Sequence, residues 1–519
     1  MPKLFYLTTA IDYTNGLPHI GHTYEKVLAD VIARFHRLKG EKVFFLTGVD
    51  QHGQKVQQSA EKAGVSPQQF VDEITAQWAA LWKKLDIRYD DWAATTNPMH
   101  KRCVQGMLQR LYHEGQIYKD KQEGYYSVRQ EQFVTDKERG ADGEFGPEWG
   151  QVEHRVEENY YFRLAAHKEW LFQYLRNNPD CVTPDFRQTE LINAVEKLSG
   201  DLCISRPKSR LSWGIELPFD HEYVNYVWFD ALTNYISFIG YDPAKSYADQ
   251  PAEFRDKWPA LHILGKDILI PAHGIYWPIM LHALGFPDEG IPKFLVHGWW
   301  NMGGDKMSKS LGNVVDPNPL IDKYGAETVR YYLVSDMVTG KDADFSEERL
   351  ITRYNSELAN SLGNLLNRAL NMTQRYRAGK LVKTGTWTTN IPDAYATSME
   401  AEQIHLGLGS ALQLSAAMNE HVEIKKPWVL AKEASQHEAL DAVLHQLSES
   451  LRIIAILISP VLPKAAHGIF DQLNWKMDLS GKEERFSLGE AAWGRLPDGH
   501  IVGKPTPLFP RIEVVPSDN

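Results

Sequence analysis

The stretch FYLTTAIDYTNGLPHIGHTYEKVLADVIARFHRLKGEKVFFLTGVD, residues 5–50, determines the expected fold. Residues 4–9 form an apolar run typical of a buried strand, and 15–18 form a turn of the Asn-Gly-Leu-Pro type. Apolar residues recur at helical spacing over 19–37, and a second apolar run follows at 43–46. Strand, helix and strand in this order predict a βαβ unit, and therefore a parallel sheet.

The rest of the chain divides into regions with different patterns. Between about 98 and 225, short strand-like runs and a loop rich in glycine and acids interrupt the sheet signal. Apolar strand patterns return at 262–265 and 293–297, and after about 345 leucine and alanine recur at three- and four-residue steps. We therefore expect an α/β fold: a Rossmann-like parallel-sheet domain with an inserted domain, then an α-helical bundle and an extended proline-rich tail.

Composition and charge exclude several classes of protein. The 519 residues carry a formal net charge of −11, so nucleic acid can bind only at a local basic patch. The three cysteines lie far apart and form no Cys-x-x-Cys pair, which argues against a disulfide framework and a zinc knuckle. The start lacks a signal-peptide pattern, and the longest strongly apolar run, 453–458, is far too short to cross a membrane. We expect a cytoplasmic protein with no membrane segment.

Two histidines lie at the predicted strand-to-helix turn. His19 and His22 are three residues apart, so they share one helix face. A helix N-terminus presents unpaired N–H groups and a partial positive charge, and both imidazoles can donate hydrogen bonds to phosphate oxygens. Gly21 has no side chain, so a flat base can approach the backbone closely. The alternative is that both histidines cap the helix and bind no ligand.

A second motif is the glycine- and lysine-containing segment 303–310, with the sequence Gly-Gly-Asp-Lys-Met-Ser-Lys-Ser. Two glycines favour a loop that can move, and Lys306 and Lys309 flank small hydroxyl groups. Such a loop can close over a triphosphate and neutralise the charge that develops on leaving pyrophosphate. The alternative is an ordinary solvated basic loop.

Together the two motifs resemble those of class I aminoacyl-tRNA synthetases, letter for letter and in the same order. Further stretches are similar to the methionine branch of that family: 9–16, 48–53, 158–162, 226–231, 265–268 and 508–513. The resemblance therefore covers nearly the whole chain. The insertion is too short to hold an editing domain as well, which also favours methionine over valine, isoleucine or leucine.

The resemblance implies an organisation and a reaction. The Rossmann-like catalytic domain would comprise 1–97 and 226–297, with a connective insertion at 98–225. A stem-contact region carrying the lysine motif would follow at 298–354, and a helical anticodon-binding domain with its tail at 355–519. The implied reaction activates L-methionine with ATP and Mg²⁺ to an adenylate. It then transfers methionine to the terminal adenosine of initiator and elongator tRNA(Met).

Site residues are implied by matching positions. The catalytic group would be His19, His22, Lys306, Lys309 and Arg206. ATP would be bound by His19, Gly21, His22, Gly265, Asp267, Lys306, Ser308 and Lys309. Methionine would be bound by Ile11, Tyr13, Asp50, Trp228, Ala231, Tyr235 and His273, because aromatic walls suit its polarizable thioether and Asp50 suits its ammonium. For the aromatic residues, core packing is the ordinary alternative.

The helical domain has a local excess of basic residues. Between 351 and 383, six basic residues face one acid in the sequence, which predicts a positive surface for RNA. Asn364, Arg368 and Trp428 match the family's anticodon-binding positions, and an exposed Trp can stack on a splayed base. For Arg375 and Arg377, a solvated helix face is an equally good interpretation.

The chain departs from one family pattern, because many methionine enzymes carry zinc-binding cysteines in the insertion and the region 126–162 has none. We therefore expect no structural zinc, and we also expect a monomer. The other hypotheses are a cysteine-specific synthetase, a small-molecule nucleotidyltransferase and a non-catalytic tRNA-binding paralogue. Cysteine enzymes use a zinc thiolate site, nucleotidyltransferases lack the helical domain, and a paralogue need not retain both lysines and both histidines.

Overall fold

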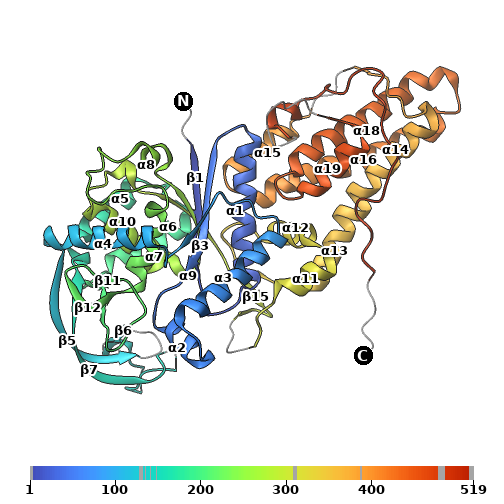
Figure 1. Cartoon of the computed structure of the whole chain (residues 1–519). Helices are drawn as coiled ribbons and strands as arrows, with labels where there is room; N and C mark the ends of the chain where they lie inside the picture. The colour runs from blue at the N-terminus through green and yellow to red at the C-terminus, as the bar shows by residue number, and fades with distance from the viewer. Residues whose placement is uncertain are drawn as a thin grey trace, which may run out of the picture.

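The computed structural model describes residues 4–127, 132–134, 136–140, 142–147, 149–307, 312–385, 389–476 and 486–513. The expected α/β architecture with a helical C-terminal bundle is confirmed (Figure 1). No helix within these ranges is long and apolar enough to cross a membrane.

A parallel sheet forms the centre of the N-terminal half. Its strand order is β2-β3-β1-β13-β14-β8, and β4 also pairs with β3. Every pairing in it is parallel. The strands are β1 (Phe5–Thr9), β2 (Asp12–Tyr13), β3 (Val43–Asp50), β4 (Asp91–Ala94), β8 (Val182–Thr183), β13 (Leu261–Gly265) and β14 (Lys293–His297). Because β1 has β3 on one side and β13 on the other, strand order reverses there, and such a reversal places a ligand crevice at the carboxyl ends.

Helix α1 (Ile20–Leu38) lies against this sheet and carries the histidine motif at its start. Its apolar residues, including Val27, Val31 and Phe35, are fully buried as the spacing predicts. Its charged residues Lys26 and Asp30 are fully buried as well. A helix buried on all sides must pair its charges internally, because burying an unpaired charge is costly. Other helices around the sheet are α2 (Gln54–Ala63), α3 (Pro67–Lys84), α7 (Val227–Ser237), α8 (Ala252–Lys257), α9 (Lys266–Ile268) and α10 (Trp277–Ala283).

The expected insertion at 98–225 is only partly separate from the sheet. It holds two small antiparallel sheets, with orders β6-β5-β7-β9 and β10-β12-β11. However, β8, inside the same range, pairs with β14 in the central sheet. A two-residue strand is too short to be recognised from its sequence pattern. The elements are α4 (Pro98–His113), β5 (Ile117–Ser127), β6 (Gln132–Val134), β7 (Val152–Phe162), α5 (Lys168–Asn177), α6 (Asp185–Glu196), β9 (Leu202–Cys203), β10 (Ser205–Pro207), β11 (Glu216–Leu217) and β12 (Asp220–Asn225).

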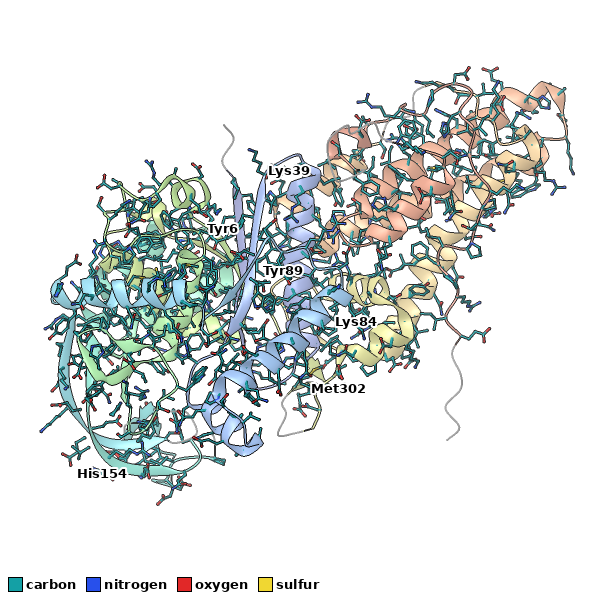
Figure 2. All side chains as sticks on the ribbon, viewed as in Figure 1. Tyr6, Lys39, Lys84, Tyr89, His154 and Met302 are labelled. Atoms are coloured by element: carbon teal, nitrogen blue, oxygen red, sulfur yellow. The ribbon has the colours of Figure 1, made fainter. Side chains whose placement is uncertain are left out.

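The long ribbon β5–β7 projects from the molecule, and His154 lies toward its outer end (Figure 2). Next to this end, the Arg139 guanidinium lies 4.6 Å from the Tyr125 ring centroid and 4.3 Å from that of Phe145. Arg139 also donates to Asp136 and to the carbonyl of Gly143, both at 2.7 Å. Stacking and hydrogen bonds therefore organise the described part of the segment between β6 and β7.

The C-terminal half is helical. The stem region holds β15 (Trp300–Met302), β16 (Asp305–Lys306), α11 (Pro317–Tyr324), α12 (Ala326–Asp336) and β17 (Ala343–Asp344). A continuous helical run of α13 (Glu347–Arg353), a π-helical segment (Tyr354–Gly363) and α14 (Asn364–Arg377) then passes straight through the expected boundary at 354/355. The bundle is completed by α15 (Ile391–Glu400), α16 (Ile404–Lys425), α17 (Pro427–Leu430), α18 (His437–Ile458) and α19 (Pro463–Gln472). The extended tail returns to this run, because Asn355 and the backbone of Ile512 exchange two hydrogen bonds of 2.9 Å.

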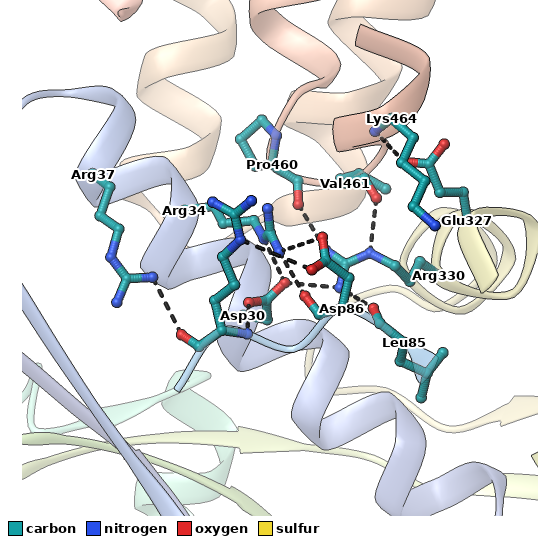
Figure 3. Close-up of polar contacts among 11 residues, drawn as sticks. Asp30, Arg34, Arg37, Leu85, Asp86, Glu327, Arg330, Pro460, Val461 and Lys464 are labelled. Carbon is teal, nitrogen blue, oxygen red and sulfur yellow. Dashed lines mark hydrogen bonds and ion pairs between the residues drawn. The ribbon is translucent and has the colours of Figure 1, made fainter. Parts of the chain in front are cut away.

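The two halves share one hydrophobic core and a buried polar junction. The Arg330 side chain from α12 pairs with Asp30 of α1 at 2.8 Å (Figure 3). The same guanidinium donates to the carbonyls of Leu85, Pro460 and Val461 at 2.9–3.1 Å. Lys39, which caps the C-terminal end of α1 and is labelled in Figure 2, pairs with Glu400 of α15. The parallel sheet and the bundle are thus linked through the helix that carries the histidine motif.

Candidate functional site

A cavity of about 770 Å³ opens at the carboxyl ends of β1 and β13. All seven residues predicted to bind methionine line it: Ile11, Tyr13, Asp50, Trp228, Ala231, Tyr235 and His273. Six of the residues predicted to bind ATP line the same cavity: His19, Gly21, His22, Gly265, Asp267 and Lys306. Ser308 and Lys309 lie outside the described residues.

The two histidines of the motif cap helix α1 reciprocally. His19 Nδ1 accepts from the backbone N–H of Gly21 at 3.0 Å, and His22 Nδ1 accepts from the backbone N–H of His19 at 3.2 Å. In the neutral imidazole an accepting Nδ1 leaves the proton on Nε2. Both rings therefore have an Nε2–H donor while they cap the helix, so capping and ligand binding are compatible functions.

The expectation of unpaired N–H groups at this helix start was wrong for two of the first amides. The N–H of Ile20 donates to the carbonyl of Val315 at 3.1 Å, and that of Gly21 donates to His19. A Cβ atom at Gly21 would lie 2.9 Å from His19 Cε1, so a larger residue here would displace the capping ring. An anion in the cavity would therefore meet the imidazoles rather than these two amides.

An aromatic and histidine cluster forms the methionine side of the cavity. Nδ1 of His273 lies 2.9 Å from the carbonyl of Ile268 and can only donate to it, so Nε2 accepts from the Tyr235 hydroxyl at 2.8 Å. Burial lowers the pKa of His273 to about 4, which keeps the ring neutral. Trp228 meets His273 edge-on at a centroid distance of 6.2 Å. These are hydrogen-bonded aromatic walls suited to a thioether.

Asp50 provides a carboxylate at the edge of this cluster. It is 8% exposed, and no ion pair among the described residues includes it. Burial, together with the nearby Asp230 carboxylate, raises the pKa of Asp50 well above its usual range. A buried carboxylate without a cation favours binding a positively charged group.

Lys306 lies beside the residues predicted to contact the nucleotide. Its ammonium is 3.2 Å from Asp267 Oδ2 and 3.8 Å from the Trp299 ring centroid. Burial opposes ionisation, yet the Lys306 ammonium and the Trp299 side chain lower the pKa of Asp267 overall. Lys266 covers the Trp299 ring at 3.9 Å and pairs with Asp342 at 2.7 Å, but it does not line the cavity.

Sequence reasoning missed a buried ionic cluster in the wall of the cavity. Lys26 donates to the carbonyl of Ala10 at 3.0 Å, to Asp12 at 3.0 Å and to Glu25 at 2.8 Å, which uses all three of its protons. Glu25 in turn lies 3.1 Å from Nε2 of His297. Burial raises the pKa of Asp12 to about 7, although Lys26 opposes this. The detectable signal was a lysine and a glutamate in a helix whose other residues predict burial.

Arg206 does not line the cavity. It lies on β10, its guanidinium is 4.7 Å from the ring centroid of Tyr226, and it donates to the carbonyl of Ser205 at 2.7 Å. Tyr226 does line the cavity, so Arg206 lies behind it, separated from the cavity by the Tyr226 side chain. A direct role for Arg206 at the reacting atoms therefore receives no support from this geometry.

The predicted anticodon residues lie on the bundle surface. Asn364 Nδ2 lies 3.4 Å from Oδ1 of Asn419, and Arg368 pairs with Glu423 at 2.7 Å, so α14 and α16 contact each other through two side-chain pairs. Trp428 follows on α17 and is 37% exposed.

The excess of positive charge on the bundle surface is smaller than the sequence indicated. Acids from other segments pair with the basic residues: Asp336 with Arg353, Glu423 with Arg368, and Asp441 with Arg377.

Metal ligands do not gather in the described part of the chain, where no group of three or more His, Cys, Asp or Glu residues could hold an ion. The three cysteines are free thiols.

Comparison with known proteins identifies the family. Residues 5–143 and 149–370 match the family described as tRNA synthetases class I (M), and residues 385–516 match the anticodon-binding domain of methionyl-tRNA ligase. The chain is 41% identical to a methionine–tRNA ligase of Halalkalibacterium halodurans, covering 99% of this chain and 79% of that protein. It is 42% identical to one of Caldanaerobacter subterraneus, covering 99% and 80%.

Solved structures agree. Mycobacterium tuberculosis methionyl-tRNA synthetase in complex with methionyl-adenylate superposes with a TM-score of 0.88 at 35% identity, covering 98% of this chain and 100% of the other. The apo form of that enzyme gives 0.83 at 32% identity, with 99% coverage of both chains. The chain therefore belongs to the methionine–tRNA ligase family, the class I synthetases that activate methionine with ATP and load it onto tRNA.

Proposed function

We propose that the cavity at the carboxyl ends of β1 and β13 holds methionine and ATP side by side for adenylate formation, with the residues in the roles that follow. The observation that supports this most strongly is that thirteen predicted residues from distant parts of the chain line one continuous space. The methionine carboxylate is already a nucleophile, so activation requires no protein base. Catalysis would depend on positioning and on electrostatic stabilisation.

In the methionine subsite, Asp50 would receive the ammonium, because it is a buried carboxylate without an ion-pair partner among the described residues. Ile11, Tyr13, Trp228 and Ala231 would enclose the side chain. The Tyr235 hydroxyl is already bonded to His273, so this part of the wall presents ring surface rather than an unsatisfied donor. Such a wall suits a thioether better than a hydroxyl or amide side chain.

In the nucleotide subsite, Nε2–H of His19 and His22 would donate to phosphate oxygens as the pentacoordinate state forms. Gly265 and Asp267 would contact the ribose, and Lys306 would leave Asp267 to meet the phosphates. Ser308 and Lys309 would stabilise the leaving pyrophosphate. Mg²⁺ would arrive on the triphosphate, because it prefers substrate phosphates and water to protein cages, and it would neutralise their charge. Arg206 would support Tyr226 from behind the cavity wall.

In the second step the terminal adenosine of tRNA(Met) would attack the adenylate, while Asn364, Arg368 and Trp428 would read the anticodon. We propose that one copy of the chain is sufficient, because both subsites and the bundle belong to one polypeptide. A cytoplasmic enzyme without structural zinc is part of the proposal, because the three cysteines are free thiols and the region 126–162, where many methionine enzymes carry zinc-binding cysteines, contains none. The catalytic halves, the insertion, the stem region and the bundle would act as the four functional units.

Methionine-dependent exchange of pyrophosphate into ATP tests the proposal. Lys309→Ala should reduce exchange by roughly 100-fold or more, as expected when one donor to the leaving group is removed. Lys84→Ala is the matched control, because Lys84 forms an exposed ion pair with Asp322 and does not line the cavity. Equal exchange in both variants would remove Lys309 from the mechanism. Exchange with cysteine in place of methionine would support the cysteine-specific alternative.

A further inference from the structure

A buried chain of four side chains lies behind the cavity wall formed by α7. Asp230 on α7 is bonded to Nδ1 of His52 at 2.6 Å and to Nε2 of His100 at 2.8 Å. Nδ1 of His100 lies 2.8 Å from Oγ of Ser237. None of the four residues is more than 2% exposed. They come from three separate segments: the loop after β3, helix α4 and helix α7.

The direction of each hydrogen bond follows from the donor inventory. An ionised carboxylate only accepts, so Nδ1 of His52 and Nε2 of His100 both carry protons. Where Nδ1 of His100 carries no proton it accepts from Ser237, whose hydroxyl also lies 3.4 Å from the carbonyl of Asn234. Burial opposes ionisation, but the two imidazoles lower the pKa of Asp230 to about 2, so the carboxylate is charged at neutral pH.

The order serine, histidine, aspartate also occurs in hydrolytic triads, but a hydrolytic role does not fit these four side chains. Ser237 is 2% exposed and does not line the cavity, so no substrate can reach its hydroxyl. Its bond goes to Nδ1 of His100, and the proton on Nε2 is held by Asp230. The chain of bonds therefore holds the segments together and has no reacting atom.

The position of the chain connects it to the methionine subsite. His52 lies two residues after Asp50, and Asp230 immediately precedes Ala231 and follows Trp228 by two residues. The 2.6 Å bond between His52 and Asp230 thus ties the loop that directly follows Asp50 to the helix that forms the methionine wall. Asp50, the last residue of β3, accepts a hydrogen bond from the Thr95 side chain and a long one, 3.4 Å, from the backbone N–H of His52. His52 therefore contacts both carboxylates, Asp50 through its backbone N–H and Asp230 through its ring.

We infer that Asp230 is a positioning residue for the methionine ammonium: through His52 it holds Asp50 at a fixed distance from the wall formed by Trp228 and Ala231. This inference rests on the proposed role of Asp50. The negative charge of Asp230 acts in the same direction, because a second carboxylate nearby increases the attraction of the site for a cation.

Ligands with and without the ammonium test the inference. The dissociation constants of L-methionine and of 4-(methylthio)butanoate, which lacks only the amino group, are measured by calorimetry together with KM for ATP. Asp230→Asn should raise the dissociation constant of L-methionine about ten-fold, the factor expected for loss of one well-placed charge-assisted bond. The dissociation constant of the amino-free analogue and KM for ATP should each change less than about two-fold. Equal weakening of both ligands would mean a merely structural role and would overturn the inference.

His52 supplies a second, independent variant pair. Leucine removes the donor to Asp230, whereas asparagine places an N–H close to the position of Nδ1. His52→Leu should reduce the preference for methionine over the analogue, and His52→Asn should restore it. Ser237→Ala is the matched control, because it breaks the far end of the chain and leaves the His52–Asp230 bond in place. If His52→Leu and His52→Asn behave alike, the inference fails, even if Asp230→Asn does not fold.

Asp50→Asn separates this inference from the proposal beneath it. If Asp50→Asn leaves the preference for methionine over the amino-free analogue unchanged, Asp50 does not bind the ammonium. The proposed role of Asp50 and the inference about Asp230 are then both wrong. If Asp50→Asn abolishes the preference while Asp230→Asn and His52→Leu keep it, only the inference about Asp230 is overturned.

Discussion

Asp30 and Arg330 form an ion pair of 2.8 Å in which both side chains are fully buried. Asp30 lies two turns after His22 on α1, and Arg330 also binds two carbonyls in the turn between α18 and α19. The pair therefore links the helix of the histidine motif to the helical bundle. Asp30 is further bonded to Arg34 at 2.7 Å and to the backbone N–H of Arg88 at 2.8 Å, so its charge is fully compensated.

Replacement of Arg330 should strongly destabilise the protein. Arg330→Met removes one ion pair and leaves buried carbonyls without donors, which should cost about 3–5 kcal/mol. Urea unfolding followed by circular dichroism measures the loss. In a double-mutant cycle, Asp30→Asn combined with Arg330→Met should be less destabilising than the sum of the single changes. Strict additivity would show that the two side chains do not act as a pair.

Asp12 should make stability depend on pH between about 4 and 7. Burial raises the pKa of Asp12 to about 7, against a usual value of about 3.9. The folded state thus holds this proton more tightly than the unfolded chain. The stabilisation is complete below pH 4 and is lost as pH rises to about 7. Melting temperatures of the wild type and Asp12→Asn should diverge from pH 5 to 8, in favour of the variant. A constant difference would exclude titration of Asp12 in this range.

Much of the fold could be predicted because strand and helix periods over 5–50 reflect which faces are buried. Most of the cavity followed as well, since the motifs fall at the carboxyl ends of parallel strands. The buried cluster around Lys26 could not be predicted. An amphipathic pattern assigns polar residues to solvent, but α1 is enclosed on every side, so Glu25, Lys26 and Asp30 are paired inside. Which partner each charge finds depends on tertiary contacts.

The charge of the bundle surface could not be predicted from the sequence either. Counting basic residues along one segment predicted a positive surface, yet Asp336, Glu423 and Asp441 approach it from other segments. Contacts between elements distant in sequence are invisible to a local count. The addition of β8 to the central sheet was missed for a related reason, because two residues carry no measurable periodicity.

Lys306 and Lys266 should differ sharply in their effect on activation. Both ammonium groups cover the Trp299 ring, at 3.8 and 3.9 Å, but only Lys306 lines the cavity. Lys306→Met should lower pyrophosphate exchange by roughly 100-fold, because the charge proposed to meet the phosphates is lost. Lys266→Met removes a charge at the same distance from the ring but outside the cavity lining, and should change exchange by less than about three-fold. Similar losses in both variants would indicate that the lysines only support Trp299.

Arg368 should contribute to tRNA recognition without affecting adenylate formation. It lies on the bundle surface, where it pairs with Glu423, and contacts to a base by such a side chain are worth about 1–3 kcal/mol. Arg368→Ala should therefore raise KM for tRNA about ten-fold or more and leave pyrophosphate exchange unchanged. Arg375→Ala is the matched control, an exposed arginine on the same helix, and should mainly reduce the salt dependence of binding.

Glu423→Gln separates a structural from a recognition role for this pair. Without the acid, Arg368 keeps a neutral acceptor at 2.7 Å and is no longer neutralised, so binding of non-cognate tRNA should increase while stability changes little. Aminoacylation of tRNA(Met) against tRNAs with other anticodons measures this preference. If Arg368→Ala and Arg375→Ala raise KM for tRNA equally and Glu423→Gln has no effect on the preference, Arg368 provides only general positive charge, and the anticodon is read elsewhere.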